Sequence, residues 1–310
     1  MKPTWKVALR GTHDADNAVI DGVEFSSAFN LDKADALLSF CGLVPEILEF
    51  NGPKAWYTDE PITMNHFRTR LARKALRILR TDEFFHHTNS DPVYRVLSPT
   101  HCGELTLHRP DNRLPRAVAA VNNFGGRIWW LRSGASLRNR LILQPQVDLF
   151  GAEESWSQFR RWPWSPAKPP ANYKGSAKTV WWDDSQVRFL AGYKVVVCLE
   201  NTFESPHYFS EKFPNAVRAG CIPVYHATPE ARAERLAGAK WVDPADFDFD
   251  PKATVDHALR QDIVEFQEIN DQWLKSPHLA ATHRRMIWER VATLMRLKIE
   301  HFQVAQNTQP

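Results

Sequence analysis

Two short apolar runs with one helix between them constrain the fold of this chain more than any other feature of its sequence. The runs cover residues 195–199 and 221–225, and unbroken apolar runs of this length are typical of strands buried on both faces of a sheet. Between them, Ser210 can cap a helix over about residues 211–219, and Gly220 is placed to end it. Strand, helix and strand form a βαβ unit, which predicts a parallel sheet.

A polar loop, residues 200–209, follows the first of these strands. It therefore lies at the carboxyl end of the strand, where open parallel sheets bind their ligands. The next helix begins near Glu211 and Lys212, and the N–H groups and positive dipole end of a helix start favour an anionic group. Tyr208 adds an aromatic ring beside them. We therefore predict that this loop binds a ligand that bears phosphate.

The order of residues in this unit resembles the donor-binding signature of the α-1,3/4-fucosyltransferases, glycosyltransferase family 10. The chain reads E-N-T from residue 200, Y-F-S-E-K from residue 208 and A-G-C-I-P-V-Y from residue 219. The family typically has E-N-[ST], a spacer, Y-[IV]-T-E-K, a helix and a strand with [VI]-P-[VI]. Here Ser210 replaces the usual threonine and keeps its hydroxyl, and the spacer is one residue longer.

The resemblance implies a GT-B-like α/β protein, in which two Rossmann-like domains face a central cleft. The expected parts are an acceptor-side domain at 1–113, a donor domain for a GDP-sugar at 114–285, and a C-terminal helix at 286–310 that packs back on the first domain. The implied reaction transfers fucose from GDP-fucose to a hydroxyl of a glycan acceptor, with inversion. Two alternatives stay open: the same fold with a different nucleotide sugar, or a non-catalytic relative that binds a glycan or nucleotide.

Site residues follow from the matched positions. The resemblance implies that Asn201, Tyr208 and Glu211 hold the phosphates, ribose or fucose of the donor, and that Lys212 offsets the charge that develops on the GDP leaving group. Another apolar run, at 117–121, precedes an Arg-Asn pair at 138–139, and the family has such a pair on the next helix.

Arg138 would then bind the donor diphosphate, because its planar guanidinium can make two charge-assisted hydrogen bonds to phosphate. The alternative is a surface arginine. Since Arg138 and Lys212 can neutralise the diphosphate together, this scheme requires no metal and no other cofactor.

The candidate catalytic base lies in the N-terminal part. Residues 57–61, Y-T-D-E-P, resemble the family's Y-T-G-E-[NP] element, whose glutamate is the proposed base, so Glu60 would remove the acceptor proton. Asp59 stands where the family usually has glycine, which tolerates a positive φ more readily. The alternative is that Glu60 is a solvated loop carboxylate beside a proline.

Other polar clusters do not indicate a metal site. His86 and His87, with His101 and Cys102 further on, lack the spacing of metal ligands and are expected to be surface histidines. The D-F-D-F-D run at 246–250 is interpreted as a turn or helix cap. The four cysteines have no C-x-x-C spacing, which indicates buried, reduced thiols in a reducing compartment.

Neither nucleic acid nor a membrane span is predicted. The net charge is only +3, which gives no global field for nucleic acid. No run approaches the ~20 apolar residues of a spanning helix, so we expect a cytoplasmic protein of the bacterial type or a shortened form. Residues 66–80 predict a basic amphipathic helix that we interpret as a solvated face, because no aromatic residues are interleaved for stacking. Peripheral contact with a membrane stays a secondary expectation.

Overall fold

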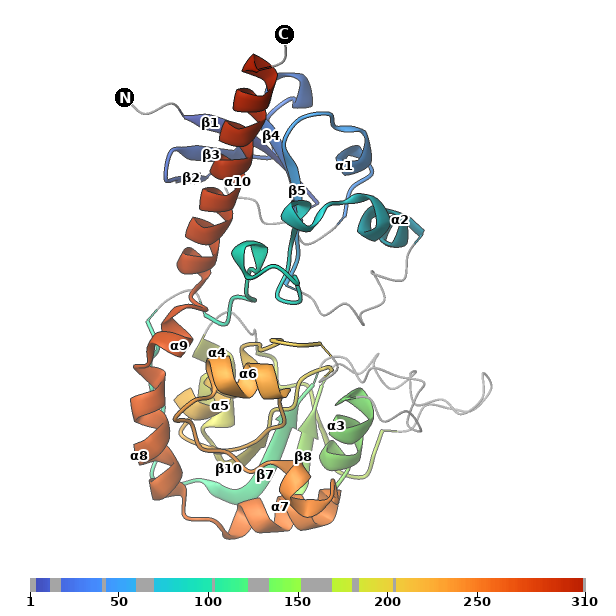
Figure 1. The fold of residues 1–310 in the computed structure, drawn as a ribbon. Helices are drawn as coiled ribbons and strands as arrows, with labels where there is room; N and C mark the ends of the chain where they lie inside the picture. The colour runs from blue at the N-terminus through green and yellow to red at the C-terminus, as the bar shows by residue number, and fades with distance from the viewer. Residues whose placement is uncertain are drawn as a thin grey trace. The chain divides into compact units, whose positions relative to one another are not determined.

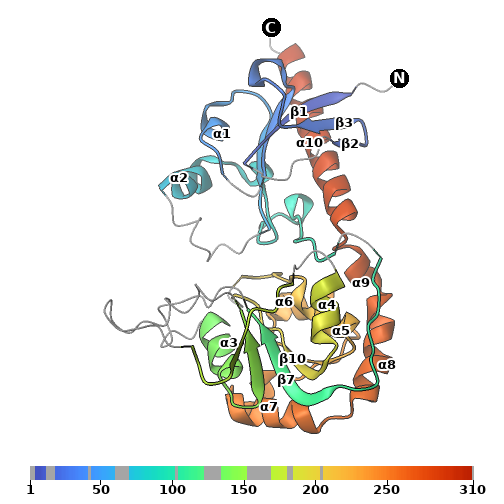
Figure 2. The ribbon, with the colours of Figure 1, turned by 180° about the vertical axis from the view of Figure 1, so that it is seen from behind.

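The computed structural model describes residues 4–11, 18–40, 43–59, 70–101, 104–121, 134–151, 169–179, 184–202 and 205–308. The chain divides into two compact units, Met1–Pro99 with Ala281–Pro310, and Thr100–Ala280. Each unit contains one largely parallel sheet packed with helices (Figures 1 and 2). Two Rossmann-like α/β domains were predicted, and these two sheets confirm that fold class.

The sheet of the first unit has six strands in the order β2-β3-β1-β4-β5-β6. All its neighbours are parallel except β2 and β3, which form a hairpin through Asp21 and Gly22. Both turn residues have a positive φ, 54° and 79°, which is the geometry of the tight hairpin turns that Asp-Gly favours. The strands are β1 (Trp5–Arg10), β2 (Ala18–Ile20), β3 (Val23–Ser26), β4 (Ala36–Phe40), β5 (Lys54–Tyr57) and β6 (Phe84–Phe85).

The last helix of the chain, α10 (Arg284–Asn307), completes the core of this first unit. Its residues Ile287, Val291, Leu294, Met295 and Ile299 recur at helical spacing and share one apolar cluster with the inner faces of β1, β3, β4 and β5. Its Trp288 stacks on Phe40, with 4.8 Å between ring centroids. Among the described residues, the other helices of the unit are η1 (Leu31–Lys33), α1 (Glu46–Glu49), α2 (Arg70–Ile78), η3 (Thr81–Glu83) and η4 (Pro92–Tyr94).

The sheet of the second unit is entirely parallel, with the strand order β11-β10-β7-β8-β9. The chain starts in the middle with β7, moves outward through β8 and β9, and returns to β10 on the other side of β7. The carboxyl ends of β7 and β10 therefore form the topological switch point of the sheet. The strands are β7 (Leu114–Ala120), β8 (Val147–Phe150), β9 (Tyr173–Gly175), β10 (Tyr193–Val197) and β11 (Ile222–Val224).

The predicted βαβ unit is present as β10, α5 (Lys212–Arg218) and β11. β10 and β11 pair in parallel from Val195 opposite Ile222, and Gly220 follows the helix with a φ of 65°. In the part of the second unit that the structure describes, the remaining helices are α3 (Gly134–Ile142), α4 (Asp184–Leu190), α6 (Pro229–Arg235), η6 (Pro244–Phe247), α7 (Pro251–Arg260), α8 (Ile263–Leu274) and α9 (Pro277–Ala280).

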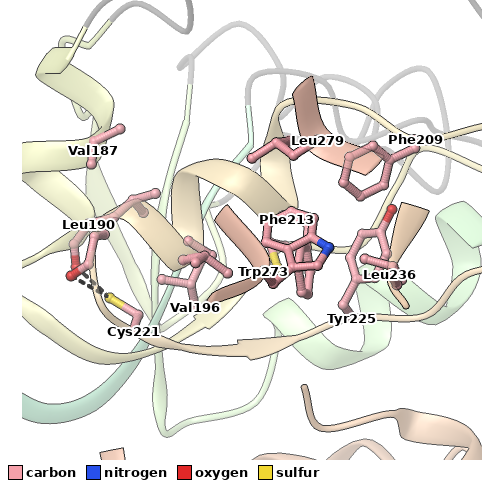
Figure 3. Close-up of a cluster of buried hydrophobic side chains, with 14 of the residues drawn as sticks. Val187, Leu190, Val196, Phe209, Phe213, Cys221, Tyr225, Leu236, Trp273 and Leu279 are labelled. Carbon is pink, nitrogen blue, oxygen red and sulfur yellow. Dashed lines mark hydrogen bonds between the residues drawn. The ribbon is translucent and has the colours of Figure 1, made fainter. Parts of the chain in front are cut away.

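Alternate residues of β7 and β10 belong to two apolar clusters, one on each face of the sheet. In the cluster of Figure 3, Phe213 of α5 packs against Tyr225 and Trp273, with 5.0 Å between ring centroids in both pairs. The second cluster joins the sheet to α3 and α7 through Leu137, Leu141 and Val255. These two cores fix the first turn of α5 and the inner face of α3 in place.

Two smaller predictions have clear outcomes. Cys198 and Cys221 are buried free thiols as expected, and burial raises the pKa of Cys221 to about 12. Asp250 caps α7 by accepting from the N–H of Ala253 at 2.8 Å, so the aspartate run does contain a helix cap. Cys41 and Cys102 lie outside the described residues.

The expectation of surface histidines at 86 and 87 is wrong. Both side chains are fully buried, because they follow directly from β6, where the Thr58 N–H donates to the Phe85 carbonyl oxygen at 3.4 Å. The His86 ring stacks on Phe84, and its centroid lies 3.9 Å from that of His87. Among the residues that the structure describes, no group of three or more His, Cys, Asp or Glu side chains is placed to hold a metal ion.

Candidate functional site

The candidate site lies where β10 ends, at the switch point of the second sheet. After Val197 the chain continues through Cys198 and Leu199, and the Cys198 N–H still donates to the Val224 carbonyl oxygen at 3.1 Å. Glu200 is therefore delivered into the interior directly beyond the strand, where it is only 3% exposed. A carboxylate at this depth requires partners for both of its oxygens.

Glu200 accepts four hydrogen bonds, two on each oxygen. Oε1 accepts from the Ser210 N–H at 2.8 Å and from the Tyr225 hydroxyl at 2.9 Å. Oε2 accepts from the Ser210 hydroxyl at 2.7 Å and from the Lys212 ammonium at 2.9 Å. One buried carboxylate at the end of β10 thus bonds to residues at the start of α5 and at the end of β11.

This arrangement changes the predicted role of Ser210. Ser210 does not cap α5, because its hydroxyl and its N–H both donate to Glu200. The residue before the helix is Glu211, in helical backbone geometry and without a side-chain cap. The Ser210 N–H, which was predicted to be available to a bound anion, therefore donates to Glu200 instead. The cationic group at the start of this helix is the Lys212 side chain.

Lys212 remains charged at neutral pH. Burial lowers the pKa of Lys212, but the charges of Glu200 and Glu211 and the hydrogen bond to Glu200 outweigh that effect and raise it above its ordinary value. Its ammonium also lies 3.0 Å from the Ser210 hydroxyl oxygen, and the side chain is 24% exposed. Lys212 is thus held firmly yet still reaches solvent at the edge of the sheet.

Arg138 approaches from the other side of the switch point. It lies on α3, the helix after β7, whose Leu137 and Leu141 pack in the core, and Arg138 itself is 3% exposed. Its guanidinium donates a hydrogen bond to the Asn201 side-chain oxygen. Burial lowers the pKa of Arg138 to about 10, so that the side chain is still a cation at neutral pH.

The structure brings the predicted donor-binding residues together at this edge of the sheet. Arg138 contacts Asn201, Lys212 contacts the neighbouring Glu200, and the charge of Glu211 helps to raise the pKa of Lys212. Tyr208 is buried, and Asn201 and Glu211 are partly exposed. Their individual roles toward a ligand stay predictions.

The spacer between Asn201 and Tyr208 contains a tight turn at residues 205–208. The Tyr208 N–H donates to the Ser205 carbonyl oxygen at 3.2 Å, Pro206 occupies the second position of the turn, and His207 has a φ of 62°. Proline followed by a positive φ is the signature of a type II turn. The His207 imidazole lies 2.9 Å from the Glu234 carboxylate, which links the turn to α6.

The candidate base Glu60 lies outside the described residues. Its neighbour Asp59 is described, and its carbonyl oxygen accepts from the Ser98 hydroxyl at 2.9 Å. Asp59 comes two residues after β5, so this segment leaves the carboxyl edge of the first sheet.

Sequence reasoning missed the central residue of the site, Glu200, and its partner Tyr225. The available signal was the position of Glu200, a carboxylate that directly follows an apolar run without a polar spacer. Such a residue cannot reach solvent and must collect donors from neighbouring elements.

Comparison with known proteins gives a resemblance of fold only. No protein-family model and no curated protein matches the chain. A solved alpha1,3-fucosyltransferase is 15% identical to it, with a TM-score of 0.47 over 95% of this chain and 90% of that one. An alpha1,3-fucosyltransferase with GDP-fucose is 14% identical, with a TM-score of 0.43 over 96% and 91%.

The lipopolysaccharide outer core galactosyltransferase WaaB in its apo form is 7% identical, with a TM-score of 0.43 over 86% and 77%. Similarity at this level establishes no family, and the fold is established by the two sheets themselves.

Proposed function

We propose that this protein is an inverting glycosyltransferase of the GT-B type that transfers fucose from GDP-fucose to a hydroxyl group of a glycan acceptor. The observation that carries the proposal is that a buried cation, Arg138, and a partly exposed one, Lys212, both lie at the switch point of the second sheet. Arg138 comes from the helix after β7 and Lys212 from the helix after β10, and they bond to the adjacent residues Asn201 and Glu200. Open α/β sheets bind nucleotides at this position.

The two cations suit a diphosphate leaving group. In a transfer with inversion, the bond between fucose C1 and the GDP oxygen breaks, and negative charge develops on the diphosphate. Arg138 and Lys212 offset that charge from fixed positions, and preorganised charges of this kind lower the barrier more than mobile ones. Glu200 orients the Lys212 ammonium from behind through its 2.9 Å contact. The scheme needs no metal, because both positive charges are supplied by the chain.

The proposed base is Glu60. It would take the proton of the acceptor hydroxyl as that oxygen attacks fucose C1. Support comes from the resemblance of the Y-T-D-E-P segment and from the position of Asp59 just beyond β5. The choice of fucose over other sugars is supported by the E-N-T and Y-F-S-E-K segments of the sequence.

The experiment that tests the donor site is calorimetric titration of GDP and GDP-fucose into the wild type, Arg138→Ala and Arg140→Ala. Arg140 is a matched control, because it lies on the same helix but is exposed. We expect Arg138→Ala to weaken binding roughly tenfold or more, about 1.4 kcal/mol, and Arg140→Ala to leave it unchanged. If the wild type binds neither nucleotide, the proposal fails.

A non-catalytic relative is the second candidate, and Asp59 in place of the family's glycine favours it. Assays of transfer and of slow hydrolysis with GDP-fucose and with other nucleotide sugars distinguish the transferase from the binding protein. A donor that binds and is never turned over would indicate a binding protein. Turnover of another nucleotide sugar alone would keep the reaction and replace the donor.

A further inference from the structure

The turn at residues 205–208 holds a histidine in a backbone geometry that favours glycine. His207 has a φ of 62° and occupies the third position of the type II turn, where glycine or asparagine is usual. A larger side chain at such a position has a steric cost and persists only where surrounding contacts stabilise it. The contacts of the His207 side chain therefore show what this residue does.

The His207 side chain contacts α6. Its Nδ1 lies 2.9 Å from Oε2 of Glu234, and the two side chains are 13% and 35% exposed. Glu230 lies one turn earlier on α6, and residues four positions apart share one face of a helix. The N–H of Glu230, the side chain of Thr228 and, to a smaller extent, protonated His207 lower the pKa of Glu230. The acidic face of α6 is thus turned toward His207.

Both ends of α6 are fixed within the second unit. At its start, the Thr228 hydroxyl accepts from a backbone N–H of the first turn at 3.3 Å. At its end, the carbonyl oxygen of Glu234 accepts from Nδ1 of His278 at 2.9 Å, and that of Arg235 accepts from the indole N–H of Trp273 at 2.7 Å. Glu234 is therefore a firm anchor for the turn.

The turn leads directly into the candidate donor site. Tyr208 is 6% exposed and is followed by Phe209, which packs in the apolar cluster of Figure 3. The next residue, Ser210, donates its N–H to Glu200 at 2.8 Å. These contacts fix the chain after Tyr208, and His207 fixes it before Tyr208 through α6.

We propose that His207 is a positioning residue of the donor site, which holds the turn at 205–208 on α6 through Glu234 and so keeps Tyr208 in the geometry that binds a nucleotide sugar. This inference rests on the proposed function, because Tyr208 is one of its donor-binding residues. A turn that is ordered before binding raises affinity, since the apparent dissociation constant is the intrinsic one divided by the fraction of competent molecules. Loss of the contact should therefore raise KM for GDP-fucose and leave kcat at saturating donor unchanged.

The test is calorimetric titration of GDP-fucose into variants of the two partners. Asparagine adopts a positive φ more readily than most residues, and its side chain is too short to reach Glu234. His207→Asn and Glu234→Ala should each raise Kd about three- to fivefold, as expected for one partly exposed ion pair. The double variant should bind no more weakly than either single variant, because both remove the same contact.

Two further variants of α6 serve as the rescue and the control. Glu234→Gln should keep most of the affinity, because its amide oxygen still accepts from the imidazole N–H. Glu230→Ala removes the neighbouring carboxylate, keeps the 2.9 Å contact and should bind like the wild type. Initial rates of transfer or donor hydrolysis then show whether the loss lies in KM, as expected, or in kcat.

Hydrogen exchange of the protein without donor is a second measurement. The amides of residues 205–208 should exchange faster in His207→Asn and Glu234→Ala than in the wild type and Glu230→Ala. Unchanged exchange, additive losses of affinity in the double variant, or a loss in kcat alone would overturn the inference. Wild-type affinity in both single variants, while Arg138→Ala still weakens binding, would overturn it and leave the proposed function intact. If the wild type binds neither GDP nor GDP-fucose, both fail.

Discussion

Replacing Glu200 by glutamine is the sharpest perturbation of the candidate site, because it keeps the shape of the side chain and removes its charge. Glu200 accepts from four donors and is 3% exposed. Glutamine has one oxygen and one NH₂ group. Whichever way the amide turns, its NH₂ group faces two donors that formerly met a carboxylate oxygen.

The less costly orientation puts the amide oxygen at the Oε1 position, where the Ser210 N–H and the Tyr225 hydroxyl still find an acceptor. The NH₂ group then faces the Ser210 hydroxyl, which can rotate to accept, and the Lys212 ammonium, which cannot. A hydrogen bond to a charged group contributes about 1.5–3 kcal/mol, and removing one partner of a buried pair costs about 3–5 kcal/mol. Since Lys212 is 24% exposed and can turn toward water, we expect the free energy of unfolding to fall by about 2–3 kcal/mol.

Urea unfolding at neutral pH measures this loss in Glu200→Gln. Glu211→Gln is the control, because it removes a carboxylate next to Lys212 that is only partly buried and should change the free energy of unfolding by less than about 0.5 kcal/mol. If both variants unfold at the same urea concentration as the wild type, Glu200 does not organise the site and the reasoning is refuted.

Two further predictions concern Tyr225 and α10. Tyr225→Phe should cost about 1.5–3 kcal/mol at neutral pH, because a donor to the Glu200 carboxylate is lost. In the folded protein, burial and, to a smaller extent, the charge of Glu200 raise the pKa of Tyr225 well above its ordinary value of 10. The stability of the wild type should therefore fall as the pH rises above about 10. In alkaline unfolding curves, Tyr225→Phe should show a smaller fall. A parallel pH dependence in both proteins would contradict this assignment. Leu294→Ala should lower the free energy of unfolding by about 2–5 kcal/mol, because Leu294 is fully buried. Leu297 lies on the same helix but is 37% exposed, so Leu297→Ala should lower it clearly less. Equal losses in the two variants would argue against the packing of α10 described above.

The sequence was informative where a residue's role is set by its own neighbours. Apolar runs at 195–199 and 221–225 predicted two adjacent parallel strands. The family resemblance assigned Arg138 and Asn201 to one donor site, and the structure places these two side chains in hydrogen-bonding contact. Ser210 was assigned incorrectly, because its hydroxyl donates to a carboxylate ten positions earlier, and capping rules consider only the local helix.

Roles that depend on distant contacts were not predictable. Glu200 is central because Tyr225, which directly follows another strand, donates a hydrogen bond to it from its hydroxyl. His86 and His87 are buried because they continue β6 beside the end of β5, which their polar character did not indicate. In each case the missing information was which segments the sheet brings side by side.

The packing of α10 has a consequence for how the protein is made. The apolar cluster of the first unit contains both the first strand of the chain and the last helix, whereas Thr100–Ala280 forms its unit from one continuous segment. A ribosome releases the N-terminal end first, and domains generally fold as units when all their residues have emerged. The second unit can therefore fold while synthesis continues, whereas the sheet of the first unit must wait, with one face uncovered, until α10 has been synthesised.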